Sequence, residues 1–143
     1  MPPQHPGASA VNALDCTVRQ LADGPINCEL TLALPGGEPL VTVVTRDAVR
    51  ALGLAEGAAV RALVHAPSVV LATGGGGPLA RNQLPGTVTA LHTGPLRAEV
   101  AVALAGGTVV LAVVSVEAVA VLGLAVGAAA QVLIQPSQVM LAG

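Results

Sequence analysis

Residues 17–37 read TVRQLADGPINCELTLALPGG, and residues 87–107 read TVTALHTGPLRAEVAVALAGG. The two stretches share one plan: a first strand-like run, a Gly-Pro turn, a run in which leucine or valine alternates with other residues, and a Gly-Gly turn. Alternation with a period of two is typical of a strand with one buried face, and paired glycines favour a hairpin. Each stretch therefore predicts strands joined by tight turns, with first strands at 16–22 and 86–92.

Both stretches belong to a longer internal repeat. Residues 9–72 align with residues 79–142 without a gap, at an offset of 70. Roughly 28 of the aligned positions are identical, which indicates a duplicated structural unit. The segment TGGGGP at 73–78 separates the copies and is typical of a flexible linker. We expect a loose tail at 1–8, one domain at 9–72, this linker, and a second domain at 79–143.

Each copy also predicts one short helix, at 45–54 and at 115–124. Thr45 and Ser115 are natural N-cap residues, and Gly53 and Gly123 suit the left-handed stop at a helix end. Four or five short strands with one helix in about 64 residues are typical of a small closed barrel of the OB type. The sequence thus predicts an all-β protein of two tandem OB-like barrels, each with one short helix. Units this small gain from further assembly.

Composition excludes nucleic acid as a partner. The chain of 143 residues is 53% hydrophobic, contains no Phe, Trp or Tyr, and has a formal net charge of −2. It therefore lacks both the positive charge that neutralises phosphates and the aromatic rings that stack on bases.

A membrane span is also excluded. Residues 118–143 carry no charge, but the aligned residues 48–73 include arginines, a glutamate and a histidine, and two copies of one fold belong in one environment. The first residues lack the pattern of a signal peptide, and Cys16 and Cys28 lack the spacing of a metal motif. We expect free thiols and a cytoplasmic protein.

Each copy resembles a Mop-type molbindin domain, the small OB-like module of the TOBE family that binds molybdate or tungstate. The second copy supplies ARNQLPGTV (80–88), AEV (98–100), GG (106–107), LGL (122–124) and SQVMLA (137–142), and the first supplies CEL (28–30), PGG (35–37), VVT (43–45), LGL (52–54) and HAPSVVLA (65–72). Two fused copies look like the tandem molbindins. That resemblance implies a homotrimer that holds molybdate or tungstate at interfaces between domains, for storage or homeostasis, and that is not an enzyme.

The chemistry of the ligand agrees with such a site. Molybdate is a tetrahedral dianion whose oxygens only accept hydrogen bonds, so its pocket needs convergent N–H and O–H donors and some positive charge. The motif positions that the resemblance assigns to oxyanion binding are Ser9, Ala10, Asn12, Thr45, His65, Ala66, Ser68, Ala80, Arg81, Asn82, Ser115, Gln135 and Ser137. Glu29 and Glu99 recur, but no carboxylate or nucleophile stands at a spacing that would make an acid/base pair with them. His5 and His92 have no other metal-ligating residues near them in the sequence, so we expect no metal-cation site.

The departures from the family pattern leave each pocket short of a donor. The pattern Ser-Ala-Arg-Asn keeps its serine but not its arginine at 9–12, and its arginine but not its serine at 79–82. The lysine of Lys-Ala-Ser-Ser is replaced by His65 and Gln135, and Pro67 and Pro136 each remove a backbone donor. Protonation of His65 would restore the missing charge.

Two outcomes remain open. In the first, a site between two copies of the domain combines Ser9 of one copy with Arg81 or His65 of another copy. In the second, some or all sites no longer bind an oxyanion, and the barrel persists as an oligomeric structural or interaction module. A stand-alone oxyanion-sensing regulatory domain is a third hypothesis. Each candidate also has a structural interpretation: a solvated Arg81, a surface His65, N-capping by Thr45 and Ser115, and a turn held by Asn12 and Asn82.

Overall fold

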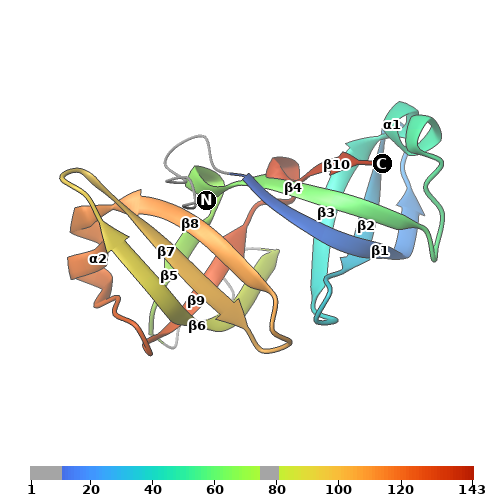
Figure 1. Cartoon of the computed structure of the whole chain (residues 1–143). Helices are drawn as coiled ribbons and strands as arrows, with labels where there is room; N and C mark the ends of the chain where they lie inside the picture. The colour runs from blue at the N-terminus through green and yellow to red at the C-terminus, as the bar shows by residue number, and fades with distance from the viewer. Residues whose placement is uncertain (1–10, 75–80) are drawn as a thin grey trace, which may run out of the picture.

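The computed structural model describes residues 11–74 and 81–143, and the predicted site residues Ser9, Ala10 and Ala80 lie outside them (Figure 1). The first half contains β1 (Val11–Asp23), β2 (Asn27–Ala33), β3 (Pro39–Thr45), α1 (Arg46–Leu52), β4 (Ala59–His65), the 3-10 turn η2 (Ala66–Ser68) and β5 (Val70–Ala72). The second half repeats it as β6 (Asn82–Thr93), β7 (Arg97–Leu104), β8 (Val109–Ser115), α2 (Val116–Leu122), β9 (Ala129–Ile134), η3 (Pro136–Gln138) and β10 (Met140–Ala142). The prediction of an all-β fold with one short helix per copy is confirmed.

The first strand of each repeat is longer than predicted. β1 begins at Val11 and β6 at Asn82, so the asparagine of the motif belongs to the first strand in both repeats, and Arg81 directly precedes it. Along β1 the buried positions continue the alternation back to Asn12, through Leu14 and Cys16. An asparagine therefore takes the first inward-facing position, where the sequence pattern suggested a turn.

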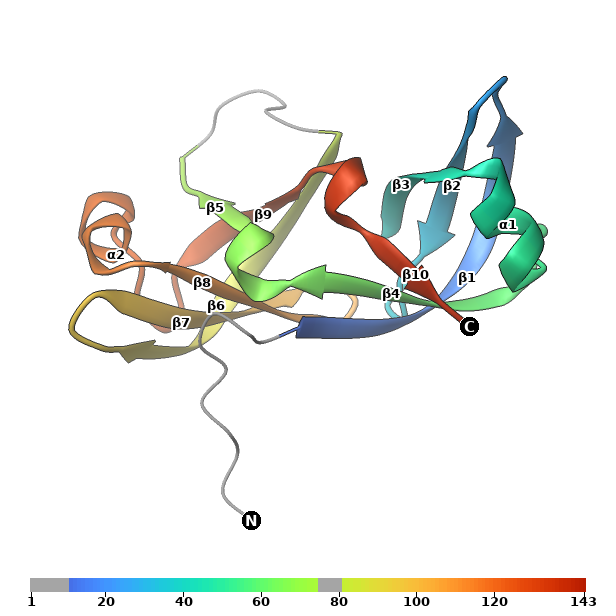
Figure 2. The same ribbon diagram turned by 90° about the horizontal axis from the view of Figure 1, so that it is seen from above.

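The two sheets exchange their last strands. One sheet has the order β10-β4-β1-β2-β3 and the other β5-β9-β6-β7-β8. Figure 2 shows β10 beside β4 in the first barrel and β5 beside β9 in the second. Each sheet thus takes three residues from the other repeat, and a single repeat supplies only four strands of its own sheet.

The chain passes between the barrels at the two 3-10 turns. Pro67 and Pro136 stand at the beginnings of η2 and η3, where the missing N–H and the fixed φ end the preceding strands β4 and β9. The predicted linker at 73–78 instead follows β5 and precedes β6, which lie in the same sheet. Within 73–78, only Thr73 and Gly74 belong to the described residues.

The core is built from small aliphatic side chains. Leu30, Leu32 and Leu40 are fully buried in the first barrel, and Val100, Val102 and Val132 are fully buried in the second. A bulge between Val18 and Gln20, repeated between Val88 and Ala90, interrupts the first strand of each sheet. Such bulges bend and twist a strand, which favours the curling of a five-stranded sheet around a narrow core.

Residues 118–143 form part of α2, then β9, η3 and β10. No helix among the described residues is long and apolar enough to span a membrane.

Candidate functional site

Asn12 and Asn82 fasten the barrels to each other. Asn82 is 2% exposed, its Oδ1 accepts from the Val41 N–H at 2.7 Å, and its Nδ2 donates to the Val41 carbonyl at 2.8 Å. Asn12 repeats both contacts with Leu111, at 2.7 and 2.8 Å, and also donates to the Val64 carbonyl at 3.2 Å. Because each contact recurs with a shift of 70, the halves are related by an approximate two-fold axis.

These contacts explain why an asparagine recurs at both positions. β3 and β8 lie at the edges of their sheets, so Val41 and Leu111 present outward N–H and C=O groups that need partners. The asparagine side chain hydrogen-bonds both the N–H and the C=O of the edge residue, as the backbone of a neighbouring strand would do. The idea that Asn12 and Asn82 hold a local turn is therefore wrong, because both bond to the opposite barrel and Asn12 bonds in addition only to Val64 on the adjacent strand β4.

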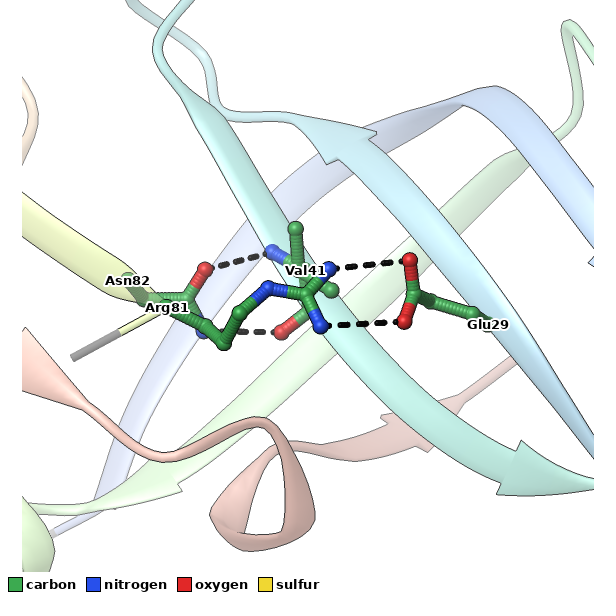
Figure 3. A network of polar contacts seen from close by, with 4 residues as sticks. All are labelled: Glu29, Val41, Arg81 and Asn82. Atoms are coloured by element: carbon green, nitrogen blue, oxygen red, sulfur yellow. Dashed lines mark hydrogen bonds and ion pairs between the residues drawn. The ribbon is translucent and has the colours of Figure 1, made fainter.

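Arg81 forms a two-pronged ion pair across the same interface (Figure 3). Its Nη1 lies 3.2 Å from Glu29 Oε2 and its Nη2 lies 2.9 Å from Glu29 Oε1, with side chains 57% and 43% exposed. Hydrogen bonding from the guanidinium holds the pKa of the Glu29 carboxyl below its usual value and raises the pKa of Arg81. The one arginine of the predicted motif thus already binds an anionic group.

The two pseudo-equivalent positions carry different chemistry. In the β1–β4 register Val11 stands opposite His65, and His65 is exposed. In the other half Asn82 stands opposite Ile134. Because the strands are antiparallel, the preceding residue Arg81 lies opposite the following residue Gln135. Within one chain, His65 therefore shares its position with Val11 and not with Arg81.

The predicted residues after β4 and β9 lie in the crossing turns. Ala66 is fully buried, and Ser68 is half-buried with its hydroxyl donating to Gln138 Oε1 at 3.2 Å. Ser137 is exposed on η3. The two crossing turns thus meet near the two-fold axis, and their polar side chains contact each other.

Thr45 and Ser115 are N-caps, as their sequence positions predict. Each hydroxyl accepts from the backbone N–H three residues later, at 3.1 Å. A shallow cavity of about 380 Å³ adjoins the first of these caps, and its charged lining residues are Arg46, Asp47 and Arg50. The second repeat has Val116 and Ala120 in place of the two arginines, so it lacks their positive charge.

Sequence reasoning missed several polar residues at the interface. Thr42 is fully buried and donates to the Pro136 and Val139 carbonyls. Glu38 accepts from the Gly106 N–H at 2.8 Å, and Thr108 accepts from the Gly36 N–H at 3.1 Å. The only advance signal was the recurrence of the two Gly-Gly turns, which here face each other across the axis.

Cys16 and Cys28 are buried free thiols. Burial raises the pKa of the Cys16 thiol to about 11. Across the residues that the structure describes, no three His, Cys, Asp or Glu side chains gather in a group that could hold a metal ion.

A family model of the TOBE domain matches residues 8–71 and, a second time, residues 78–141. The chain belongs to the TOBE-domain family. The two matches coincide with the two repeats, and the resemblance to tandem Mop-domain molbindins is confirmed by the relatives that follow.

This TOBE protein is 39% identical over 133 residues to the molybdenum-pterin-binding protein MopA of Rhodobacter capsulatus, covering 92% of the chain and 50% of MopA. It is 38% identical over 135 residues to the molybdenum transport protein ModE of Azotobacter vinelandii, covering 94% of the chain and 50% of ModE. The chain therefore spans about half the length of these curated relatives. A solved structure of the cytoplasmic molybdate-binding protein ModG, with molybdate bound, has a TM-score of 0.86 and 45% identity, covering 91% of this chain and 94% of that one.

Proposed function

We propose that this TOBE protein binds molybdate, with tungstate as an alternative ligand, for storage or homeostasis of the oxyanion and not for catalysis. The observation that carries the proposal is the match to molybdate-bound ModG, which covers both barrels at 45% identity. The names of MopA and ModE, which also refer to molybdenum, support the same ligand chemistry.

The predicted residues offer the donor types that a tetrahedral dianion needs. Arg81 brings a guanidinium, His65 an imidazole that protonation would charge, and Ser68, Thr45 and Ser137 bring hydroxyls. Asn12 and Asn82 act differently, since their amides are already bonded to the opposite barrel. We propose that they position the ends of β1 and β6 and do not contact the ligand.

We propose further that the sites are completed between chains of a homotrimer in the cytoplasm. Arg81 and His65 lie at different pseudo-equivalent positions of one chain. Packing of one chain against the next is the route by which a single pocket acquires the guanidinium, the imidazole and the hydroxyls. Ser9 and Ala80, which precede β1 and β6 in sequence, are further candidate contributors.

Isothermal titration with molybdate, tungstate and sulfate tests the ligand. We expect heat from the first two and none from sulfate, which is smaller. Arg81→Ala should weaken binding, whereas Arg61→Ala should not, because Arg61 is an exposed arginine that pairs with Asp15 away from the motif. A folded protein that gives no heat with molybdate would refute the proposal. Light scattering on the same sample measures the trimer.

A second candidate function is an oligomeric structural module that has lost its ligand. The ion pair of Arg81 favours this hypothesis, because both terminal nitrogens of the guanidinium already bind Glu29. This hypothesis expects a normal trimer that gives no heat with any oxyanion. A stand-alone sensing domain is the third, because the chain aligns with half of ModE, and it expects oxyanion binding to alter association with a separate protein.

A further inference from the structure

Glu29 and Arg81 come from different barrels. Glu29 lies on β2 of the first barrel, and Arg81 directly precedes β6 of the second. Two charged hydrogen bonds join them, at 2.9 and 3.2 Å, and both side chains keep about half of their surface in solvent. An anion that arrives from solution therefore has access to the pair.

A carboxylate and a tetrahedral oxyanion make the same demand on a guanidinium. Both offer oxygens that only accept, and both suit the parallel N–H bonds of the arginine fork. In this chain the Glu29 carboxylate takes the two terminal nitrogens of Arg81 (Figure 3). It also neutralises the positive charge that would offset the desolvation of a dianion.

Asn82, the residue next to Arg81, keeps the backbone in place when the Arg81 side chain changes its partner. Asn82 is buried and bonded to both polar groups of Val41, so the backbone beside Arg81 is fixed to the first barrel. The guanidinium can turn from Glu29 to another anion by side-chain rotation alone, without separation of the barrels.

We infer that Glu29 is an internal competitor of the oxyanion for Arg81 and that it sets the affinity of the arginine-containing site. The inference rests on the proposed function, since it assumes that the oxyanion reaches Arg81. It assigns to Glu29 an effect on ligand affinity that a merely stabilising surface ion pair would not have.

The repeat supplies a matched control. Glu99 is the counterpart of Glu29 at an offset of 70, and Val11 is the counterpart of Arg81. Glu99→Gln removes the same charge from the same place in the other barrel, where the aligned position holds no arginine. A general effect of net charge would act equally on Glu29→Gln and Glu99→Gln, whereas competition acts only on Glu29→Gln.

The experiment is titration of molybdate into the full chain and into Glu29→Gln, Glu99→Gln and the double variant Glu29→Gln/Arg81→Ala. We expect Glu29→Gln to bind roughly three- to tenfold more tightly, the range that loss of an exposed ion pair and of one repulsive charge implies. Glu99→Gln should change affinity less than twofold, and the double variant should lose the gain. Glu29→Ala repeats the test without an amide, and far-UV circular dichroism checks that each variant is folded.

The outcomes separate the inference from the proposed function. If the parent chain binds molybdate and Glu29→Gln binds equally or more weakly, competition is refuted while the function stands. If Glu29→Gln binds and the parent chain does not, competition is supported and the function of the unaltered chain is refuted. If neither binds, both are refuted. Equal gains in Glu29→Gln and Glu99→Gln would reduce the effect to net charge and refute competition.

Discussion

Replacement of Asn82 by alanine should remove one of the two asparagine contacts between the barrels. The change removes two hydrogen bonds, at 2.7 and 2.8 Å, and leaves the N–H and C=O of Val41 without those partners. Each lost bond of this kind costs about 1 kcal/mol, and more where the remaining group stays dry. We therefore expect a loss of roughly 2–4 kcal/mol in the free energy of unfolding, and a similar loss for Asn12→Ala.

The assay is urea denaturation followed by far-UV circular dichroism, because the chain has no Trp or Tyr to report by fluorescence. Asn27→Ala is the control, since Asn27 is an exposed asparagine at the start of β2, and it should cost less than about 0.5 kcal/mol. Asn82→Asp is the sharper variant. It keeps an acceptor for the Val41 N–H but turns an oxygen, in place of an N–H donor, toward the Val41 carbonyl.

We expect Asn82→Asp to be at least as unstable as Asn82→Ala at neutral pH, because an acceptor that faces an acceptor is worse than a missing group. If Asn82→Asp is as stable as the parent chain, the hydrogen bond from Asn82 Nδ2 to the Val41 carbonyl does not stabilise the fold. A loss below about 0.5 kcal/mol for Asn82→Ala would refute the role of the asparagines as interface anchors.

Three further predictions concern the barrel interface and the core. Gly106→Ala should cost about 1–3 kcal/mol on denaturation, because a Cβ there would lie 2.6 Å from the Gly36 Cα; an unchanged stability would contradict the contact between the hairpins. A chain that ends at residue 74 should elute as a dimer, because β5 no longer has β9 to pair with and can pair with β4 of a second copy; a folded monomer would contradict it. Because the pKa of Cys16 is raised to about 11, only the unfolded chain loses this proton above pH 9, so stability should fall by about 2 kcal/mol more between pH 8 and 10.5 in the parent chain than in Cys16→Ala; equal slopes would contradict the buried, protonated thiol.

Local signals in the sequence were enough to predict the elements of each barrel. The alternation around Leu30 and Val100 predicted strands, and Thr45 and Gly53 marked the helix ends that the structure places at the same residues. These signals succeed because burial periodicity, capping and turn formation depend on residues within a few positions of each other.

The candidate site was less predictable. Residue types at the motif positions indicated an arginine, a histidine and hydroxyls, but not that Arg81 would meet Glu29 across the interface. A residue 52 positions away leaves no local pattern, and the recurrence of glutamate at 29 and 99 indicated only the internal repeat.

The sequence by itself determined that this protein consists of two copies of one strand-rich unit, because the repeat at an offset of 70 and the periodicity within it are written in the residues. Only the tertiary structure decided which copy completes which sheet. The last strands, VLA at 70–72 and MLA at 140–142, are almost identical, so either one fits either barrel. Pro67 and Pro136 end the preceding strands and turn the chain, and the buried bonds of Asn12 and Asn82 hold the barrels where exchange brings each strand to the opposite sheet.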